Sequence, residues 1–374
     1  MSIGISFLSH FEALSDPRQL IKVLYPLNEI LLLSLCAILC GGEGPQDIED
    51  YGHDKLDFLR RILPFNNGVP DHNTIGRVLS GLDPVEFQKI FIEWVTSLQK
   101  ELPDVIAIDG KTLRHSFDTN HPAIHMVSAF ACNQRLVLAQ QKVDEKSNEI
   151  RAVPKLLDLL VLKGAIVTAD AMSCQREITQ KVVEKEGDYL FSLKGNQGTL
   201  HADVKEFLDQ QIKDNFKKSR VDKFESQEKG HGRIESRICY SCNDIEWLQK
   251  RHAWPGLQSI VALYSKRTIG DKVEEETRYF ISSLPMNAEK AAHAVRAQWG
   301  IENQVHWVLD VVFLDDQCRV RKDFAPQNLH VIKQSALNIL RQAPDNKSLR
   351  RKRKSADRND DYLLQVLRMA NVSA

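Results

Sequence analysis

The order of apolar runs between residues 104 and 197 limits the folds open to this chain more than any other feature of its sequence. Three runs typical of strands follow one another, and two helices then alternate with two further strands. The segments are "DVIAIDG" (104–110), "AIHMVSAFA" (123–131), "RLVLAQQKV" (135–143), a helix at 147–164, "AIVTAD" (165–170), a helix at 174–187 and "DYLFSLKGNQ" (188–197). Because strands connected through helices run parallel, we predict an α/β fold in which the later strands extend the sheet beside the first.

Two aspartates stand at or near the carboxyl ends of strands in this predicted sheet. Asp109 closes the first strand and Asp170 closes the fourth. Ligands bind at the carboxyl ends of neighbouring parallel strands, which lie roughly 5 Å apart. We therefore expect the two carboxylates to meet across one strand spacing. The alternative is that each aspartate only forms a turn.

The segments on either side have different patterns. Residues 1–100 are predicted to be helical, and the apolar run at 30–40 is about half the roughly 20 residues needed to span a bilayer, so it indicates a buried helix. Two short helices are predicted at 71–82 and 83–99. The first begins at Asp71 or Asn73 and the second at Asp83, and they meet at Gly81. They form either a plain helical subdomain or a helix-turn-helix that reads DNA. Residues 196–285 are predicted to add β-structure before helix resumes at 287–310.

The composition is that of an ordinary globular protein, with 43% apolar and 27% charged residues. The formal net charge of zero does not exclude nucleic acid, because binding depends on where positive charge clusters. The chain has no basic segment with a cleavage site at its start, and its seven cysteines lack the spacing of a disulfide framework. We therefore expect a cytoplasmic protein without a membrane segment.

The helix at 287–310 carries a glutamate in apolar and aromatic surroundings. Gln298, Glu302 and His306 share one face of this helix, and Trp299 lies on the adjoining face. A glutamate buried there needs a charge partner, either a divalent cation or Arg296. The alternative to a ligand role for Glu302 is a salt bridge at the surface.

Three carboxylates on a sheet and a helix suit a hard cation. Mg²⁺ takes oxygen ligands, and two such ions about 4 Å apart activate the attacking oxygen and stabilise the leaving oxygen in a phosphoryl displacement. Asp109, Asp170 and Glu302 are therefore candidate metal ligands. Lys111, two residues after Asp109, is a candidate contact for a phosphate.

Six segments together resemble the motifs of insertion-sequence transposases with a DDE triad, specifically the H-repeat-associated proteins linked to Rhs elements. They are "IAIDGKTLRHSFD", "DEKSNEI", "IVTADAMSCQ", "YLFSLKGNQ", "HGRIESR" and "WGIENQVHWVLDVVF", and the resemblance runs from about residue 10 to the C-terminus. It implies a ribonuclease-H-like catalytic domain with a β-rich insertion, preceded by a helical N-terminal domain. It also implies that Asp109, Asp170 and Glu302 are catalytic and hold Mg²⁺ or Mn²⁺, with two ions, to cut and join DNA.

Residues predicted to contact DNA surround these acids. They are Lys111, Lys194, Asn196, Gln197, Arg233, Arg237, Arg296, Asn303 and His306. Related transposases often carry tyrosine, arginine and lysine at fixed offsets around the glutamate, where this chain has Val295, Gln298 and Leu309. The last three of the predicted contacts are therefore expected to replace them at phosphates. For residues 194–197 the alternative is a polar turn.

The sequence allows two interpretations for each of two further sets of acidic residues. Glu149 either supports the metal ligands or only favours the dipole at the start of its helix. Asp310, Asp315 and Asp316 compete with Glu302 for the place of the third acid, although the apolar run around them indicates structural burial.

Two further motifs also have alternatives. "CYSC" (239–242) with His231 and His252 allows a zinc site, but the chain has no second cysteine pair. The segment "KSLRRKRK" (347–354) is either a solvated helix end or a grip on DNA.

The sequence thus predicts three parts. They are a helical domain at 1–100 that is a candidate for binding DNA ends, a catalytic domain at 101–345 with a β-rich insertion at about 196–285, and a basic tail at 346–374. The main hypothesis is a transposase that cleaves and joins strands at insertion-sequence ends, as a homodimer on double-stranded DNA in the bacterial cytoplasm. The alternatives are an inactive DNA-binding remnant of a transposase and a host nuclease of the same fold that acts on RNA hybrids.

Overall fold

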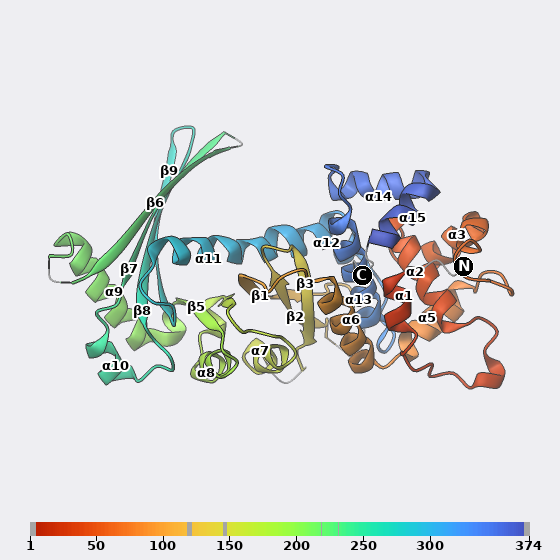
Figure 1. Cartoon of the computed structure of the whole chain (residues 1–374), viewed down its shortest axis with the longest axis horizontal. Coiled ribbons are helices and arrows are strands. Elements are labelled where there is room, and N and C mark those ends of the chain that lie inside the picture. Colours follow the sequence, from red (N-terminus) through yellow and green to blue (C-terminus); the bar gives the residue numbers. More distant parts are fainter. Residues whose placement is uncertain (1–4, 118–121, 145–147, 218, 231, 370–374) are drawn as a thin grey trace.

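The computed structural model describes residues 5–117, 122–144, 148–217, 219–230 and 232–369. The molecule is elongated, with a lobe of helices at one end, a sheet in the middle and long β-hairpins at the other end (Figure 1). One helix, α11 (Ala288–Ile301), runs from the hairpins to the middle of the molecule. The predicted combination of a helical N-terminal region with an α/β sheet is confirmed.

Within the described residues, the sheet has nine strands in the order β3-β2-β1-β4-β5-β9-β8-β7-β6. The first five along the chain are β1 (Val105–Thr112), β2 (His125–Ala131), β3 (Leu136–Lys142), β4 (Ile166–Ala169) and β5 (Asp188–Leu193). β2 pairs antiparallel with β1 and β3, whereas β4 runs parallel to both β1 and β5. The predicted order and direction of these five strands are therefore confirmed.

Helices cover both faces of the central strands. α7 (Glu149–Asp158) and α8 (Arg176–Glu184) lie on one side, against β2, β3 and β5, and α11 crosses the other side against β1, β4 and β5 (Figure 1). The first four residues of β1 and all of β4 are buried. Continuous apolar runs such as these are typical of parallel strands that are covered on both faces.

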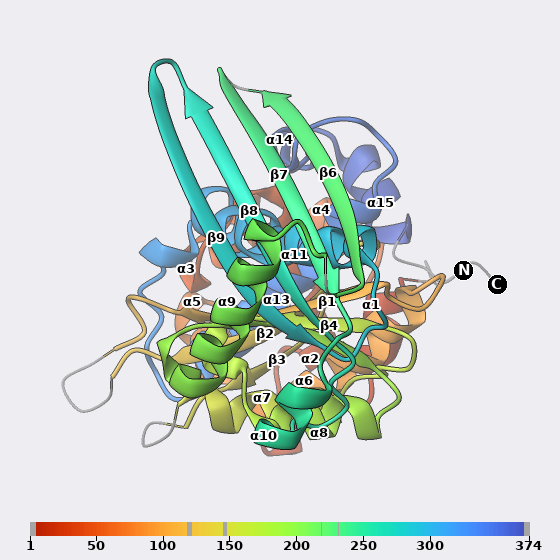
Figure 2. The same cartoon turned by 90° about the vertical axis from the view of Figure 1, so that its left-hand side faces the viewer.

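The β-rich insertion extends the same sheet. It contains α9 (Gly198–Lys213), β6 (Val221–Gly230), β7 (Arg233–Cys242), α10 (Glu246–His252), β8 (Ser259–Ile269) and β9 (Lys272–Ser282). β9 pairs antiparallel with β5. We call the four strands β6 to β9 the blade, and their tips stand clear of the rest of the molecule (Figure 2). The sequence prediction missed α9, although its buried Leu200, Val204 and Leu208 recur at the four-residue spacing of a helix.

The helical lobe is built from both ends of the chain. The N-terminal part supplies α1 (Ser6–Phe11), α2 (Leu27–Cys40), α3 (Pro45–Asp54), α4 (Leu56–Leu59), α5 (His72–Gly81) and α6 (Pro84–Leu98). The C-terminal part supplies α12 (Trp307–Val311), α13 (Ala325–Gln342), α14 (Leu349–Arg358) and α15 (Asp360–Met369). α13 packs against α2, α5 and α6, and α14 packs against α2, so the two ends share one core.

α2 is the buried helix that the apolar run at 30–40 predicts, since its residues from Glu29 to Leu39 are all buried. The Glu29 carboxylate accepts a hydrogen bond from the Phe65 amide at 2.7 Å, which satisfies one of its two oxygens. Among the described residues, no single helix is both long and apolar enough to cross a membrane. Only α2 and α3 taken together reach that length and composition, and they are bent by 93°.

The helix pair α5 and α6 begins as predicted. Asp71 caps α5 by accepting a hydrogen bond from the Thr74 amide, and Asp83 caps α6. The aromatic side of α6 packs against α1, α13 and β3. Its exposed side pairs Lys89 with Glu93 at 3.9 Å, which leaves little net charge for a DNA backbone. These contacts favour a packed helical subdomain over a second helix that reads DNA.

The described part of the predicted basic tail is folded onto the lobe as α14 and α15. Lys352 and Arg353 are buried there. Lys352 Nζ donates to the carbonyls of Leu340 (3.0 Å) and Ala343 (2.7 Å), and an Arg353 guanidinium nitrogen donates to the Ile38 carbonyl at 2.8 Å. These two residues are therefore neither part of a solvated helix end nor available to bind DNA. Their hydrogen bonds attach α14 to the core.

Candidate active site

The register of the parallel strands brings Asp109 and Asp170 to one edge of the sheet. Ile108 of β1 lies opposite Ala169 of β4, so the next residue on each strand is an aspartate. The predicted proximity of the two aspartates follows from this backbone pairing. Asp109 does not close its strand, however, because β1 continues to Thr112 and Asp109 pairs with Ser128 of β2.

Asp170 sits in surroundings that disfavour a bare negative charge. It opens the short turn η2 (Ala171–Ser173), and its carboxylate accepts a hydrogen bond from the Ser173 amide at 3.2 Å. Burial raises the pKa of Asp170, and the carboxylates of Glu149 and Asp109 raise it further. A divalent cation at this position would offset both effects.

Glu302 reaches the aspartates from the far end of α11. Gln298 Nε2 donates a hydrogen bond to the Ile108 carbonyl at 3.1 Å, which ties the helix to β1 beside Asp109. The helix then continues as a π-helical turn, η4 (Glu302–His306). Such turns are rare in proteins as a whole, but many of those that occur lie at functional sites. They shift the side chains that follow relative to a regular helix.

His306 lies between two of the acids. Its Nδ1 is 3.4 Å from Asp109 Oδ2 and 3.4 Å from Glu302 Oε2, and its side chain is only 7% exposed. The sequence predicts a phosphate contact for His306, but the π-helical turn directs the ring inward against the carboxylates. One ligand atom from each of these three residues lies within 4.8 Å of the other two, close enough to hold a metal ion.

All three predicted acids line one cavity of about 300 Å³, which we call the acid cavity. Side chains from β4, β5, β9 and α11 complete its wall, including Thr168, Leu190, Ser192, Lys194, Arg278, Phe280, Val295, Gln298 and Trp299. Asp170 reaches this cavity from the start of the turn after β4 without joining the close group of Asp109, Glu302 and His306. The carboxylate oxygens are ligands that Mg²⁺ and Mn²⁺ prefer, so the residues present fit such a metal.

Comparison with known proteins decides the family. Residues 100–339 match the family described as Transposase DDE domain, and residues 8–95 match one described as DDE_Tnp_1-associated. The chain belongs to the DDE transposase family. The resemblance seen in its motifs is thereby confirmed.

Curated relatives agree with this assignment. "Putative transposase YncI" of Escherichia coli O157:H7 is 43% identical over 97% of this chain and 94% of its own length. "H repeat-associated putative transposase YhhI" of Escherichia coli (strain K12) is 42% identical over 98% of each chain. A shorter relative from strain K12, "Inactive transposase YbfQ", is 48% identical over 20% of this chain and 87% of its own length.

The Lys111 ammonium has no free charge to offer a phosphate. Its side chain is 6% exposed, and its ammonium contacts Asp310 and lies 3.3 Å from Asp316 Oδ1 and 3.9 Å from Asp315 Oδ2. Lys111 could make the predicted phosphate contact only by releasing these three carboxylates. The same contacts engage the three aspartates that compete with Glu302, and among the described residues none of them lines the acid cavity.

Gly110 lets another acidic residue approach the site from the opposite face of β1. Glu149, the first residue of α7, has its Oε1 2.6 Å from His125 Nε2, and His125 Nδ1 is 2.9 Å from Thr112 Oγ1. A Cβ on Gly110 would overlap the Glu149 carboxylate and the His125 ring. Glu149 is thus both at a helix start and near enough to raise the pKa of Asp170, as both sequence interpretations require.

The segment after β5 meets the site in two ways. Lys194 is exposed and lines the acid cavity, as a phosphate contact requires. Asn196 and Gln197 instead donate their side-chain amides to the carbonyls of Ala171 (2.6 Å) and Cys174 (2.9 Å). These two amides therefore brace the turn that carries Asp170. The predicted contacts with DNA would require the amides to break these hydrogen bonds.

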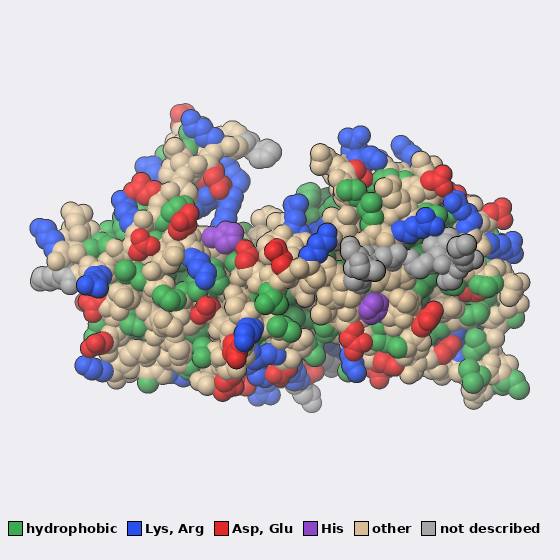
Figure 3. All heavy atoms as spheres, viewed as in Figure 1, with side chains coloured by type: hydrophobic (Ala, Val, Ile, Leu, Met, Phe, Trp, Pro, Cys, Tyr) green, Lys and Arg blue, Asp and Glu red, His purple; other side chains and the backbone are tan. Residues whose placement is uncertain are grey.

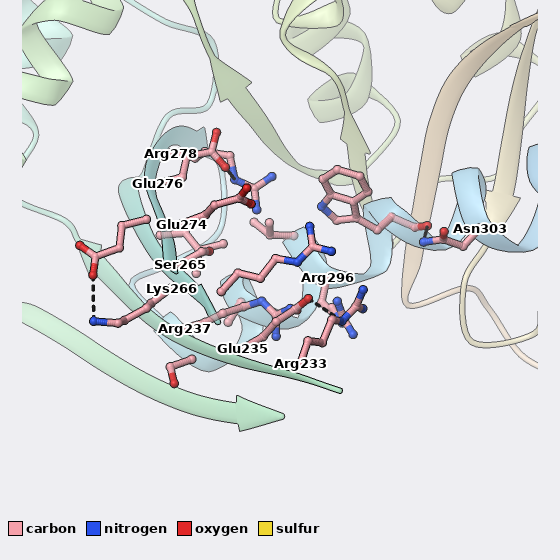
Figure 4. A pocket seen from close by; sticks show the side chains of 17 residues that line it. Arg233, Glu235, Arg237, Ser265, Lys266, Glu274, Glu276, Arg278, Arg296 and Asn303 are labelled. Carbon is pink, nitrogen blue, oxygen red and sulfur yellow. Dashed lines mark hydrogen bonds and ion pairs between the residues drawn. The ribbon is translucent and has the colours of Figure 1, made fainter. Parts of the chain in front are cut away.

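A second groove of about 410 Å³, the blade groove, lies where the blade meets α11 (Figure 4). It adjoins the acid cavity, because Arg278, Val295 and Trp299 line both. Four predicted DNA contacts line it, namely Arg233, Arg237, Arg296 and Asn303. In the space-filling view a hollow separates the blade from the helical lobe, and Lys and Arg side chains lie on the blade's side of it (Figure 3).

Carboxylates of the blade already hold the arginines of this groove. Arg296 lies 2.7 Å and Arg237 3.4 Å from the same Glu228 oxygen, while Arg233 lies 3.0 Å from Glu235. Arg237 also contacts Glu235. The groove has the cations that the sequence predicts, and DNA phosphates would have to replace these glutamates as their partners.

The cysteine and histidine motif on β7 does not form a zinc group among the described residues. Cys239 and Cys242 are buried and unpaired. His252 Nε2 lies 2.6 Å from Asp203 Oδ2, which engages that ring nitrogen. His231 lies outside the described residues.

Proposed function

We propose that this chain is a transposase that cleaves DNA at the ends of an insertion sequence and transfers the freed strand, with Asp109, Asp170 and Glu302 as its metal-binding catalytic residues. The observation that carries the proposal is the convergence of these carboxylates on one cavity, from β1, from the turn after β4 and from the π-helical turn after α11. Membership of the DDE transposase family supports it.

Mg²⁺ or Mn²⁺, with two ions bound, would supply activation of the attacking water or 3′-OH and stabilisation of the leaving oxygen. The protein supplies the placement of the ligands. Asp109 is held within a paired strand and Asp170 within a braced turn, whereas the Glu302 side chain is 58% exposed. His306, buried between Asp109 and Glu302, orients both carboxylates. The site thus has two fixed acids and one acid with room to adjust.

The test replaces each acid by its amide. Asp109→Asn, Asp170→Asn and Glu302→Gln should each abolish Mg²⁺-dependent cleavage of a duplex that carries the element end, because each change removes a charged metal ligand. Binding of the same duplex should persist. The exposed Glu93→Gln on α6, outside both cavities, is the matched control and should cleave normally. Normal cleavage by any of the three site variants would refute the assignment of that residue.

An inactive DNA-binding remnant is the second candidate function, because a relative of this chain carries the name "Inactive transposase YbfQ". That relative matches only 20% of this chain, whereas this chain has all three acids. A transposition assay with a marked element separates the two. Movement of the element that depends on the three acids supports the transposase, and binding without movement supports the remnant.

The partners in this proposal are double-stranded DNA and a second copy of the chain. Deleting the N-terminal helices would be a poor test of DNA binding, because α13 packs against α2, α5 and α6 and would lose its cover. The double variant Arg233→Gln/Arg237→Gln is more specific. It should weaken binding of every duplex and reduce the salt dependence of binding, since it removes backbone contacts. Light scattering with and without the end duplex tests for the homodimer.

A further inference from the structure

Arg278 stands where the acid cavity and the blade groove meet. It lies on β9, which runs antiparallel to β5. Leu193 of β5 pairs with Tyr279 of β9, so the next residue after Leu193, Lys194, lies opposite Arg278. Among the described residues that line the acid cavity, Lys194 and Arg278 are the cations. The same cavity is therefore lined by these two positive side chains and by the carboxylates of Asp109, Asp170 and Glu302.

Aromatic rings hold the Arg278 guanidinium in place. Its central carbon is 5.9 Å from the ring centroid of Phe280 and 5.9 Å from that of Trp299. Figure 4 shows Arg278 reaching from the blade strands into the blade groove. Both rings also line the acid cavity, so the stacking fixes the guanidinium at the edge of the site.

The Arg278 side chain is partly removed from water without a full set of partners. It is 23% exposed, and its Nε makes no hydrogen bond to any described residue. The nearest carboxylate is that of Glu276 at 3.8 Å, whose side chain is 68% exposed. Withdrawing a charged donor from water without a hydrogen bond is costly, so this arrangement favours an anionic ligand.

A second arginine shows what a purely structural guanidinium looks like in this fold. Arg353 is buried, and it donates hydrogen bonds to the carbonyls of Ile38 and Val312. Its nitrogens are directed at backbone oxygens of the core. Arg278 has no equivalent set of acceptors and faces a cavity instead.

We propose that Arg278, with Lys194 beside it, forms an anion subsite that binds the phosphodiester group on which the three acids act. This inference rests on the proposed function. A guanidinium presents N–H groups in a fixed fork that matches two oxygens of one phosphate. The subsite therefore holds the non-bridging oxygens of the reacting phosphate and opposes the negative charge that develops there. Arg278 of β9 supplies this contact, because the residues of α11 that line the acid cavity, Val295, Gln298 and Trp299, carry no positive charge.

Two variants of Arg278 separate the contribution of its charge from that of its geometry, and a third variant is a control. Arg278→Gln removes the charge, and Arg278→Lys keeps the charge but loses the fork. Arg176→Gln is the matched control, because Arg176 also stacks on a tryptophan, Trp254, at 4.7 Å, but it is exposed and lines neither cavity. Thermal unfolding of each variant shows whether it is folded.

The first measurement is the single-turnover rate of Mg²⁺-dependent cleavage of the end duplex. Arg278→Gln should lower this rate by about 100-fold, the usual loss for one donor to a developing anion. Arg278→Lys should lose less, and Arg176→Gln should cleave at the wild-type rate. The Mg²⁺ concentration that gives half the maximal rate should not change, since the metal ligands are intact. Wild-type cleavage by folded Arg278→Gln would overturn the inference.

The second measurement does not depend on cleavage. End duplexes carry one neutral methylphosphonate, placed in turn at each phosphate around the element end, and their affinities are measured without a divalent cation. At the bound phosphate this change should weaken wild-type binding about tenfold, as expected for a lost charge-assisted hydrogen bond. Arg278→Gln should show no such loss at that position. Equal losses in both proteins at every position would overturn the subsite.

The two measurements distinguish the inference from the proposed function. A wild-type protein that does not cleave but shows the methylphosphonate effect only when Arg278 is present keeps the subsite and loses the proposed reaction. A wild-type protein that cleaves, with no dependence on Arg278 in either measurement, keeps the reaction and loses the subsite.

Discussion

Gly110 is the residue on which two faces of the site depend. On one face of β1 the neighbouring Asp109 lines the acid cavity, and on the other face the paired His125 and Glu149 lie directly over the glycine. Any side chain at position 110 would compete for that space. The glycine is required by close packing, since its backbone lies in an ordinary strand.

Gly110→Ala should therefore separate His125 from Glu149 or shift β1. Overpacking of this kind typically costs about 1–3 kcal/mol, which chemical denaturation would measure. Cleavage should fall as well, because Asp109 is the adjoining residue. Gly198→Ala, where a Cβ meets nothing within 4 Å, is the matched control and should leave stability equal or higher. Equal stability of the two variants would show that the pair over Gly110 is not tightly packed.

Residue types and spacing predict the three acids but not the cations around them. Asp109 and Asp170 follow apolar runs whose pairing can be inferred, so their meeting is predictable. Lys111 has the right charge beside Asp109, yet Asp310 and its neighbours, which are far away in the sequence, bind it. Arg278 is one arginine of a long strand, and only the pairing of β9 with β5 brings it to the acids.

At the scale of elements, a buried group of charges joins β1 to the helical lobe. Asp315 of the turn η5 (Asp315–Gln317) receives a hydrogen bond from Lys333 of α13 at 2.9 Å. His330 of the same helix lies 3.2 Å from Asp315, and Lys111 of β1 lies 3.9 Å away. Lys333 and Asp315 are 1% and 5% exposed, so water does little to screen this pair.

Lys333→Met should destabilise the fold, because it leaves the Asp315 charge buried with weaker partners. Breaking a buried pair costs about 3–5 kcal/mol, and we expect the lower end since His330 and Lys111 remain. The double variant Asp315→Leu/Lys333→Met should recover most of the loss in urea unfolding. A double variant as unstable as the single one would mean that the pair contributes through packing rather than charge.

Asp315 also gives the fold a defined sensitivity to acid. Burial alone would raise the pKa of Asp315, but the charges of Lys333, His330 and Lys111 together hold it well below its usual range. A carboxyl with a depressed pKa stabilises the fold fully above its unfolded pKa, about 3.9, and this contribution is lost as the pH falls.

The unfolding free energy of the wild type should therefore exceed that of Asp315→Asn by a constant amount above about pH 4. Below that pH the difference should shrink by about 1.4 kcal/mol per pH unit, because the unfolded state takes up the proton first. Urea unfolding at several pH values between 3 and 6 measures it. A difference that stays constant down to pH 3 would contradict the proposed charge pairing.

The periodicity of the sequence predicts the central strands better than the insertion. Short apolar runs between turn residues mark β1 to β5, and their crossover helices fix the direction of the later strands. The insertion is recognisable as β-rich, but β6 is mostly exposed and carries no apolar run to place it. Its attachment through β9 to β5 depends on edge pairing between distant segments, which local patterns do not encode.

At the scale of the whole molecule, the first and last helices form one unit. α14 packs against α2, α15 packs against α13 and α14, and Arg353 of α14 donates to the Ile38 carbonyl near the end of α2. α14 therefore helps to shield α2, which is almost wholly apolar, from water.

Removing residues 346–374 should lower the melting temperature, because it exposes α2 and leaves backbone carbonyls of the core without their donors. The double variant Arg351→Gln/Lys354→Gln removes two exposed basic charges from α14 without touching its packing, and it should melt like the wild type. A truncated protein that melts normally but binds DNA more weakly would restore the interpretation of this segment as a DNA grip.

The continuous hydrogen bonding from β5 to β9 has a mechanical consequence. Lys272, the first residue of β9, lies six positions before Arg278, a span of about 20 Å at the usual rise of a strand. That equals the length of about six base pairs. If a duplex lies along the hairpins, the paired strands hold its contacts with the start of β9 at a fixed distance from the acid cavity. That distance would then determine which phosphodiester bond lies at the acids.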